Sequence, residues 1–71
     1  MKIHNGTLAD IAIQCVHPET KSTGCWLFVA GNHREHGTSV SPLFDNLAPL
    51  YGWMRENGWK TIGRRAIYQK H

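Results

Sequence analysis

A group of cysteine and histidine residues in the first half of the chain has the chemistry of a metal site. Its members are Cys15, His17, Cys25, His33 and His36. Zinc takes four nitrogen or sulfur ligands in a tetrahedron, and this group could supply them. The spacing matches neither C-x2-C nor H-x3-5-H, so two other interpretations stay open: buried thiols beside surface histidines, or a disulfide. We expect no metal or cofactor, and keep the five residues as candidate ligands of a zinc-stabilised module.

The last quarter of the chain gathers basic and aromatic residues that could bind a macromolecule. They are Arg55, Trp59, Lys60, Arg64, Arg65, Tyr68 and Lys70. Positive groups neutralise phosphates, and aromatic faces stack on unpaired bases. Arg64 and Arg65 are adjacent, so at most one of them joins Tyr68 on a given face of a regular strand. The alternative is a solvated strand whose charges discourage edge-to-edge aggregation, since no recognised nucleic-acid motif accompanies them.

Three tryptophans cannot all be fully buried in so small a domain. Trp53 lies beside the apolar stripe of a predicted helix, where it is either exposed or packed against the preceding loop. Exposed Trp, Tyr and Arg are the residue types that dominate protein-interface hot spots. The sequence therefore predicts one partner-binding surface, formed by Trp53, Arg55, Lys60, Arg64, Arg65 and Tyr68.

Catalysis has little support in the sequence. His33, Glu35 and His36 are titratable and close together, and Ser39 and Ser41 follow them. No nucleophile elbow is present, and a small sheet offers little concave volume for a preorganised pocket. We expect no enzyme and name no catalytic residue.

The segment LAPLYGWMRENGWKTIGRRAIYQKH resembles the opening helix, glycine, aromatic residue and strand of HicA-type toxins. These toxins are small ribonucleases with a fold like that of double-stranded-RNA-binding domains. The resemblance covers about the last third of the chain and implies the same order of helix and strand there. That family's catalytic histidine follows in the next strand, in a Gly-Ser-His context. No such element occurs before His71, so the nuclease activity is not implied.

The elements that must position these residues begin with a helix. Four apolar residues recur at i, i+3, i+4 and i+7, the spacing of one helical stripe: Leu47, Leu50, Tyr51 and Met54. Asn46 suits the N-cap, which places Pro49 in the tolerant first turn, and Asn57-Gly58 offers a left-handed stop. Ser41-Pro42 resembles an earlier cap, so we expect a short turn over residues 42–45 before the helix proper.

Three strands are expected around this helix. Residues 8–17 alternate, with Ile11, Ile13 and Cys15 on one face, and residues 25–30 are apolar throughout. A turn centred on Thr20 would pair these two segments and set Cys15 opposite Cys25. Residues 31–40 form a polar loop. Residues 60–69 form a third strand, or two short ones bent at Gly63.

The expected fold class is α+β, a β-β-α-β domain spanning residues 1–71. One amphipathic helix packs on a three-stranded antiparallel sheet, against Ile11, Ile13, Leu27 and Val29. The second strand, the most apolar, should lie in the middle or pair with a second subunit. The open edges leave room for a homodimer through an edge strand.

Composition sets the broad class. A hydrophobic content of 41% in 71 residues favours a folded domain over disorder. No apolar run approaches the roughly 20 residues that cross a bilayer, and the first residues lack the apolar core of a secretory signal. We therefore expect a cytoplasmic protein with thiol cysteines and no membrane partner. Charge is uneven: residues 55–71 hold five basic residues against one acidic residue, and residues 1–54 hold three against four.

These observations favour a small non-enzymatic regulatory or inhibitory binding protein that occupies a surface of a larger macromolecule. The partner is expected to be a protein rather than a nucleic acid. Phage-encoded inhibitors of host machinery are one class of this kind, by analogy of size alone. The alternatives are a nucleic-acid-binding domain that uses the basic C-terminal strand, and a zinc-stabilised module.

Overall fold

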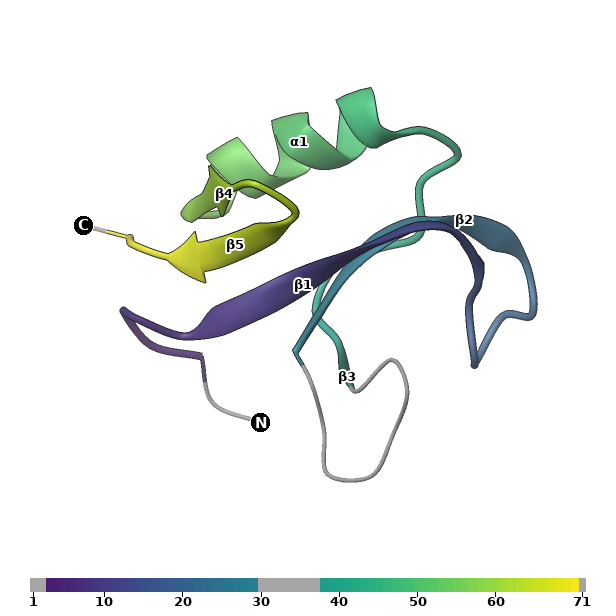
Figure 1. Ribbon diagram of the computed structural model, residues 1–71, viewed down its shortest axis with the longest axis horizontal. Helices are drawn as coiled ribbons and strands as arrows, with labels where there is room; N and C mark the ends of the chain where they lie inside the picture. Colours follow the sequence, from purple (N-terminus) through teal and green to yellow (C-terminus); the bar gives the residue numbers. More distant parts are fainter. Residues whose placement is uncertain (1–2, 30–37, 71) are drawn as a thin grey trace.

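The computed structural model describes residues 3–29 and 38–70, and in them one helix packs on a face of a five-stranded antiparallel sheet (Figure 1). The elements are β1 (Leu8–Val16), β2 (Thr23–Val29), β3 (Thr38–Ser39), α1 (Leu47–Glu56), β4 (Trp59–Ile62) and β5 (Arg65–Tyr68). The strand order is β3-β2-β1-β5-β4. The α+β class is confirmed, and the prediction of three strands is wrong.

Two short segments account for the difference in strand number. Residues 38 and 39, expected in the polar loop, form β3 and pair with Val29 and Phe28 of β2. The predicted third strand is instead a hairpin, in which Gly63 and Arg64 form a two-residue turn closed by Ile62 and Arg65. Gly63 has φ +60°, as the first central position of a type II′ turn requires. The option of two short strands bent at Gly63 is therefore confirmed.

β1 is the middle strand of the sheet because β2 pairs with one of its edges and β5 with the other. It pairs with β2 along most of its length and with β5 at residues 8–10. β2 lies between β1 and β3, so the prediction that it occupies the centre is wrong, although it has a neighbour on each side. Beyond β3, the outer side of β2 is covered at Cys25, whose backbone exchanges hydrogen bonds of 2.7 and 2.9 Å with Phe44.

A β-bulge in β1 changes which residues share a face. Ala12 pairs with Trp26 but Cys15 pairs with Gly24, so two residues of β1 lie opposite one residue of β2. Gln14, one of the two, adopts φ +52°. After the bulge the alternation of side chains is reversed. Cys15 therefore joins Ala12 and Trp26 on one face, and the prediction that it shares a face with Ile11 and Ile13 is wrong.

The apolar stripe of α1 is buried against the sheet, as predicted. Leu50 and Met54 are fully buried, and Leu47 and Tyr51 are half-buried at the sides. They join a cluster with Ala9, Ile11, Cys25, Leu27, Trp59 and Ala66. The opposite face of the sheet carries a second, smaller cluster of Ala12, Trp26 and Phe28, with Cys15 and Leu43 packed against it. The helix thus covers one face only.

The ends of α1 follow the local sequence. Asn46 is the N-cap with extended backbone, although its side chain makes no capping hydrogen bond. At the other end the Asn57 backbone N–H donates to the carbonyls of Trp53 and Met54, and Gly58 follows at φ +88°. A Cβ at Gly58 would lie 2.9 Å from the Cβ of Lys70, so the chain turns here through space that only glycine leaves free.

Ser41 is not a helix cap. It is buried, and its hydroxyl accepts a hydrogen bond of 2.9 Å from the Leu27 N–H of β2 while donating to the Pro42 carbonyl. α1 begins six residues later. Ser41 therefore provides the acceptor for the buried Leu27 N–H on the outer side of β2.

Candidate functional site

The structure does not bring the predicted cysteine–histidine cluster together. Cys15 and Cys25 belong to clusters on opposite faces of the sheet, because the bulge at Gln14 separates them, and both are free thiols. The expectation that they face each other is wrong. His33 and His36 lie outside the described residues. Within residues 3–29 and 38–70, no three His, Cys, Asp or Glu side chains are grouped as metal ligands would be.

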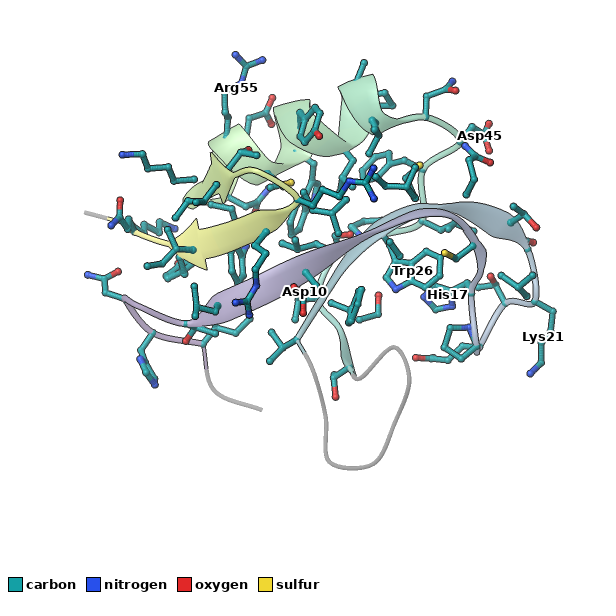
Figure 2. The ribbon with its side chains drawn as sticks, in the orientation of Figure 1. Asp10, His17, Lys21, Trp26, Asp45 and Arg55 are labelled. Atoms are coloured by element: carbon teal, nitrogen blue, oxygen red, sulfur yellow. The ribbon has the colours of Figure 1, made fainter. Side chains whose placement is uncertain are left out.

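His17 has a structural role in the β1–β2 turn. It is 5% exposed, and its ring lies against that of Trp26 with centroids 4.9 Å apart, as the neighbouring side chains in Figure 2 show. Its Nδ1 accepts hydrogen bonds from the backbone N–H groups of Glu19 and Thr20, at 3.1 and 3.4 Å. The ring therefore provides an acceptor for two backbone donors and organises the turn.

The predicted partner-binding residues lie on different sides of the molecule. Trp53 and Arg55 are two positions apart on α1, and therefore about 200° apart around its axis. Trp53 is half-buried against the main core, whereas Arg55 projects into solvent (Figure 2). Tyr68 packs against Trp59, with ring centroids 5.2 Å apart, on the face that α1 covers. No single surface joins Trp53, Arg55 and Tyr68.

The other three predicted residues, with nearby aliphatic side chains, lie together at the β4–β5 hairpin. Register places Lys60, Ile67 and Leu8 in one row, and Ile62, Arg65 and Asp10 in the next. Their chain neighbours Ala9, Trp59 and Ala66 belong to the cluster under α1, so these rows face the opposite, helix-free side. We call the set the hairpin surface: Leu8, Lys60, Ile62, Arg65 and Ile67 on this face, together with Arg64, which is exposed in the turn at the end of the hairpin.

The hairpin surface is both apolar and basic. Leu8 and Ile62 are 45% and 53% exposed, and Ile67 is half-buried between them. Arg65 forms an ion pair with Asp10, its cross-strand partner, at 2.9 Å from Nε to Oδ1. Asp10 projects from the side of β1 away from α1 (Figure 2). One acidic residue therefore offsets part of the positive charge, and Lys60 and Arg64 remain exposed.

A second feature lies where α1 approaches the edge strand β4. Two shallow pockets of about 440 and 410 Å³ share Arg55 and Thr61. The first is completed by Ala48 and Tyr51 of the helix. The second is completed by Gly58, Trp59, Lys60 and Gln69. Because they share residues, we treat them as one feature, the α1–β4 groove.

Several of these residues were missed from the sequence for a physical reason. Tyr51 was assigned to the buried stripe, but it lies at the side of the helix, one turn before Arg55. Leu8, Ile62 and Ile67 were placed in the predicted strands over residues 8–17 and 60–69, but without a surface. Only their pairing partners reveal which face they occupy, and register is a long-range property. The one local signal was the alternation of side chains along residues 60–62, which puts Lys60 and Ile62 on one face of the strand and Thr61 on the other.

No family model, curated protein or solved structure matches the chain. The resemblance of residues 47–71 to HicA-type toxins thus stays an expectation from the sequence. No helix among the described residues combines the length and the apolar character needed to span a bilayer.

Proposed function

We propose that this chain is a small cytoplasmic, non-enzymatic binding protein that regulates or inhibits a larger protein by occupying its surface. The hairpin surface is the contact region. The observation that supports this is the pair of large aliphatic side chains, Leu8 and Ile62, held about half exposed on a strand face beside Lys60 and Arg65. Ile67 of β5 lies between them, so the three aliphatic side chains form one strip across β1, β5 and β4. Exposed apolar patches rimmed by charge are typical of interaction sites.

The proposal drops three of the residues selected from the sequence. Arg55 belongs to α1, on the other face of the sheet. Trp53 and Tyr68 pack into the core, so they hold the sheet and helix together and do not contact the partner. Lys60, Arg64 and Arg65 stay in the surface. Their charges steer association and set orientation, while the aliphatic side chains supply the area removed from water.

A photo-crosslinking amino acid at position 62 tests the proposal in cells of the native host. Val16 provides the matched control, because it is an aliphatic residue that is 56% exposed, against 53% for Ile62. It lies at the end of β1 opposite to Leu8, away from the hairpin surface. We expect a discrete crosslinked species from position 62 and none from position 16. Leu8→Glu should abolish the crosslink, since it places a charge in the apolar part of the contact, and Thr23→Glu should not. Equal crosslinking from both positions, or none from either, contradicts the proposal.

Direct nucleic-acid binding is the second candidate function, supported by the exposed cations Arg55, Lys60, Arg64 and Lys70, none of which has an ion pair among the described residues. The arrangement favours contacts to phosphates without stacked bases, because Tyr68 lies under α1 against Trp59. Affinity for single- and double-stranded oligonucleotides should then fall steeply with salt. Absence of binding at low salt removes this candidate.

A further inference from the structure

We propose that the outer edge of β4 accepts an extended acidic segment of the partner protein, which adds a strand to the sheet and lies in the α1–β4 groove. The inference rests on the proposed function for the existence of a partner. It deepens that function by naming the partner's chemistry and a second point of contact, on the far side of the hairpin from Leu8.

The hydrogen bonds of β5 identify which groups of β4 are free to pair. The Tyr68 N–H donates to Thr7 next to β1, whereas the Gln69 N–H donates to Gly58 next to β4. Antiparallel bonding alternates, so Gly58, Lys60 and Ile62 direct their backbone groups toward β5. Thr61 therefore directs its N–H and C=O outward. β4 is the last strand of the described sheet, and Thr61 is exposed while Trp59 is 5% exposed.

The groove gives an added strand a place for its side chains. Thr61 lies in both pockets, so a strand paired with it would run between β4 and the Tyr51–Arg55 side of α1. Successive residues of a strand point to opposite faces. Alternate side chains would then enter the groove under α1, and the others would extend the helix-free face beyond Lys60 and Ile62. Backbone hydrogen bonds supply affinity in this mode of recognition, and the side-chain pockets supply selectivity.

Charge decides between an acidic segment and a second copy of this chain. Arg55 and Lys60 line the groove, and no acidic residue lines either pocket. Glu56 is about 100° further around the helix than Arg55, on the Trp53 side. Two copies paired through β4 would bring together two sets of Arg55, Lys60 and Arg64, which repel one another. A segment with carboxylates places opposite charges there instead.

Nuclear magnetic resonance of the ¹⁵N-labelled chain tests the inference with a short capped peptide of alternating glutamate and valine. We expect binding below millimolar concentration, with slowed hydrogen exchange at the Thr61 amide and shifted resonances in residues of the groove. A peptide of alternating lysine and valine should not bind. The glutamate peptide methylated on alternate backbone nitrogens should also fail, because it cannot donate to the edge.

Two pairs of variants separate the contributions of charge and backbone to peptide binding. Arg55→Glu should weaken peptide binding by at least about tenfold, because it reverses the charge on the groove. Lys21→Glu makes the same change in net charge at the opposite end of the molecule (Figure 2) and should have little effect. Thr61→Pro removes the outward N–H without touching a bond to β5, and should abolish binding, whereas Thr61→Ala should retain it.

Three results of the peptide experiments overturn the inference: no binding at millimolar peptide, binding without protection of Thr61, or equal loss of binding from Arg55→Glu and Lys21→Glu. Protection of Thr61 that grows with protein concentration in the absence of peptide also overturns it, because the occupant is then a second copy. A partner crosslinked from position 62 whose binding leaves Thr61 unprotected refutes the edge contact alone. The proposed function survives that result, so the two failures are distinguishable.

Discussion

Buried polar side chains in this small protein support the backbone. The hydroxyl of Ser41 accepts a hydrogen bond from the N–H of Leu27, and the ring of His17 accepts hydrogen bonds from two N–H groups of its own turn. Each acceptor lies where no strand covers the donor. A buried backbone donor without a partner costs more than a typical hydrogen bond gains, so Ser41, which accepts from the buried Leu27, is more sensitive than its polarity suggests.

Ser41→Ala should lower the free energy of unfolding by about 1 to 3 kcal/mol, because the buried Leu27 N–H loses its acceptor. In a domain of this size, that corresponds to a fall in melting temperature of at least about 4 °C. Thermal unfolding followed by circular dichroism measures it.

Ser39→Ala is the matched control, since that hydroxyl is half-buried and donates only to the Ser41 carbonyl. Its expected effect is within about 0.5 to 1.5 kcal/mol, the net value of an ordinary hydrogen bond. If both variants lose the same stability, Ser41 has no special role.

At this scale the sequence could predict residue types but not their partners. The alternation of Ile11, Ile13 and Cys15 is a regular strand pattern, and nothing local marks Gln14 as the residue with φ +52°. The bulge is accompanied by a long-range contact of Gln14. The Gln14 side chain donates to the Asp45 carbonyl, 31 residues away in sequence, at 2.9 Å. The zinc hypothesis depended on the unbroken alternation, and the bulge separates its two cysteines.

Among the elements, α1 was predictable because its signals are local. Period, proline position and the Asn57-Gly58 stop all lie within the segment itself. β3 was not, since a two-residue strand has no period to detect. The hairpin at Gly63 was left as one of two options. Neither a single strand nor a hairpin at this position predicts the hairpin surface, because Leu8 joins it only through the pairing of β5 with β1.

The contact between β2 and the segment before α1 depends on a glycine. A Cβ at Gly24 would lie 2.5 Å from the Phe44 carbonyl oxygen, which is fixed backbone hydrogen-bonded to Cys25. Gly24→Ala should therefore destabilise the fold by about 1 to 3 kcal/mol through overpacking. Chemical denaturation measured by tryptophan fluorescence gives the value.

Gly52→Ala is the same substitution where nothing obstructs it. Gly52 lies within α1 with no atom within 4 Å of the added Cβ, so alanine should stabilise the helix by about 0.5 to 1 kcal/mol. We therefore expect the free energy of unfolding to fall in Gly24→Ala and to rise in Gly52→Ala. Destabilisation by both would show that the Gly24 effect is not specific to the Phe44 contact.

For the molecule as a whole, one face of the sheet is closed by α1 and the other is only partly closed. The radius of gyration is 11.3 Å, close to the roughly 11 Å expected of a compact chain of this length. Trp26 and Phe28 are nevertheless buried on the second face, while Leu8 and Ile62 are left exposed there. The face of the sheet opposite α1 is therefore covered near β2 and exposed near the β4–β5 hairpin. The exposed part is the region available to a partner.

The reactivity of the two cysteines probes how well each face of the sheet is covered, because Cys15 and Cys25 lie on opposite faces. Cys25 is 1% exposed under α1, and Cys15 is half-buried on the other face. In Cys15→Ala, the remaining thiol should react with a labelling reagent only through global unfolding, at a rate that falls with the free energy of unfolding. In Cys25→Ala, the thiol of Cys15 should react much faster, through local opening. Neither reductant nor a zinc chelator should move the melting temperature of the unmodified chain. Equal labelling rates would contradict the burial of Cys25 beneath the helix, and a fall in melting temperature with chelator would restore the zinc hypothesis.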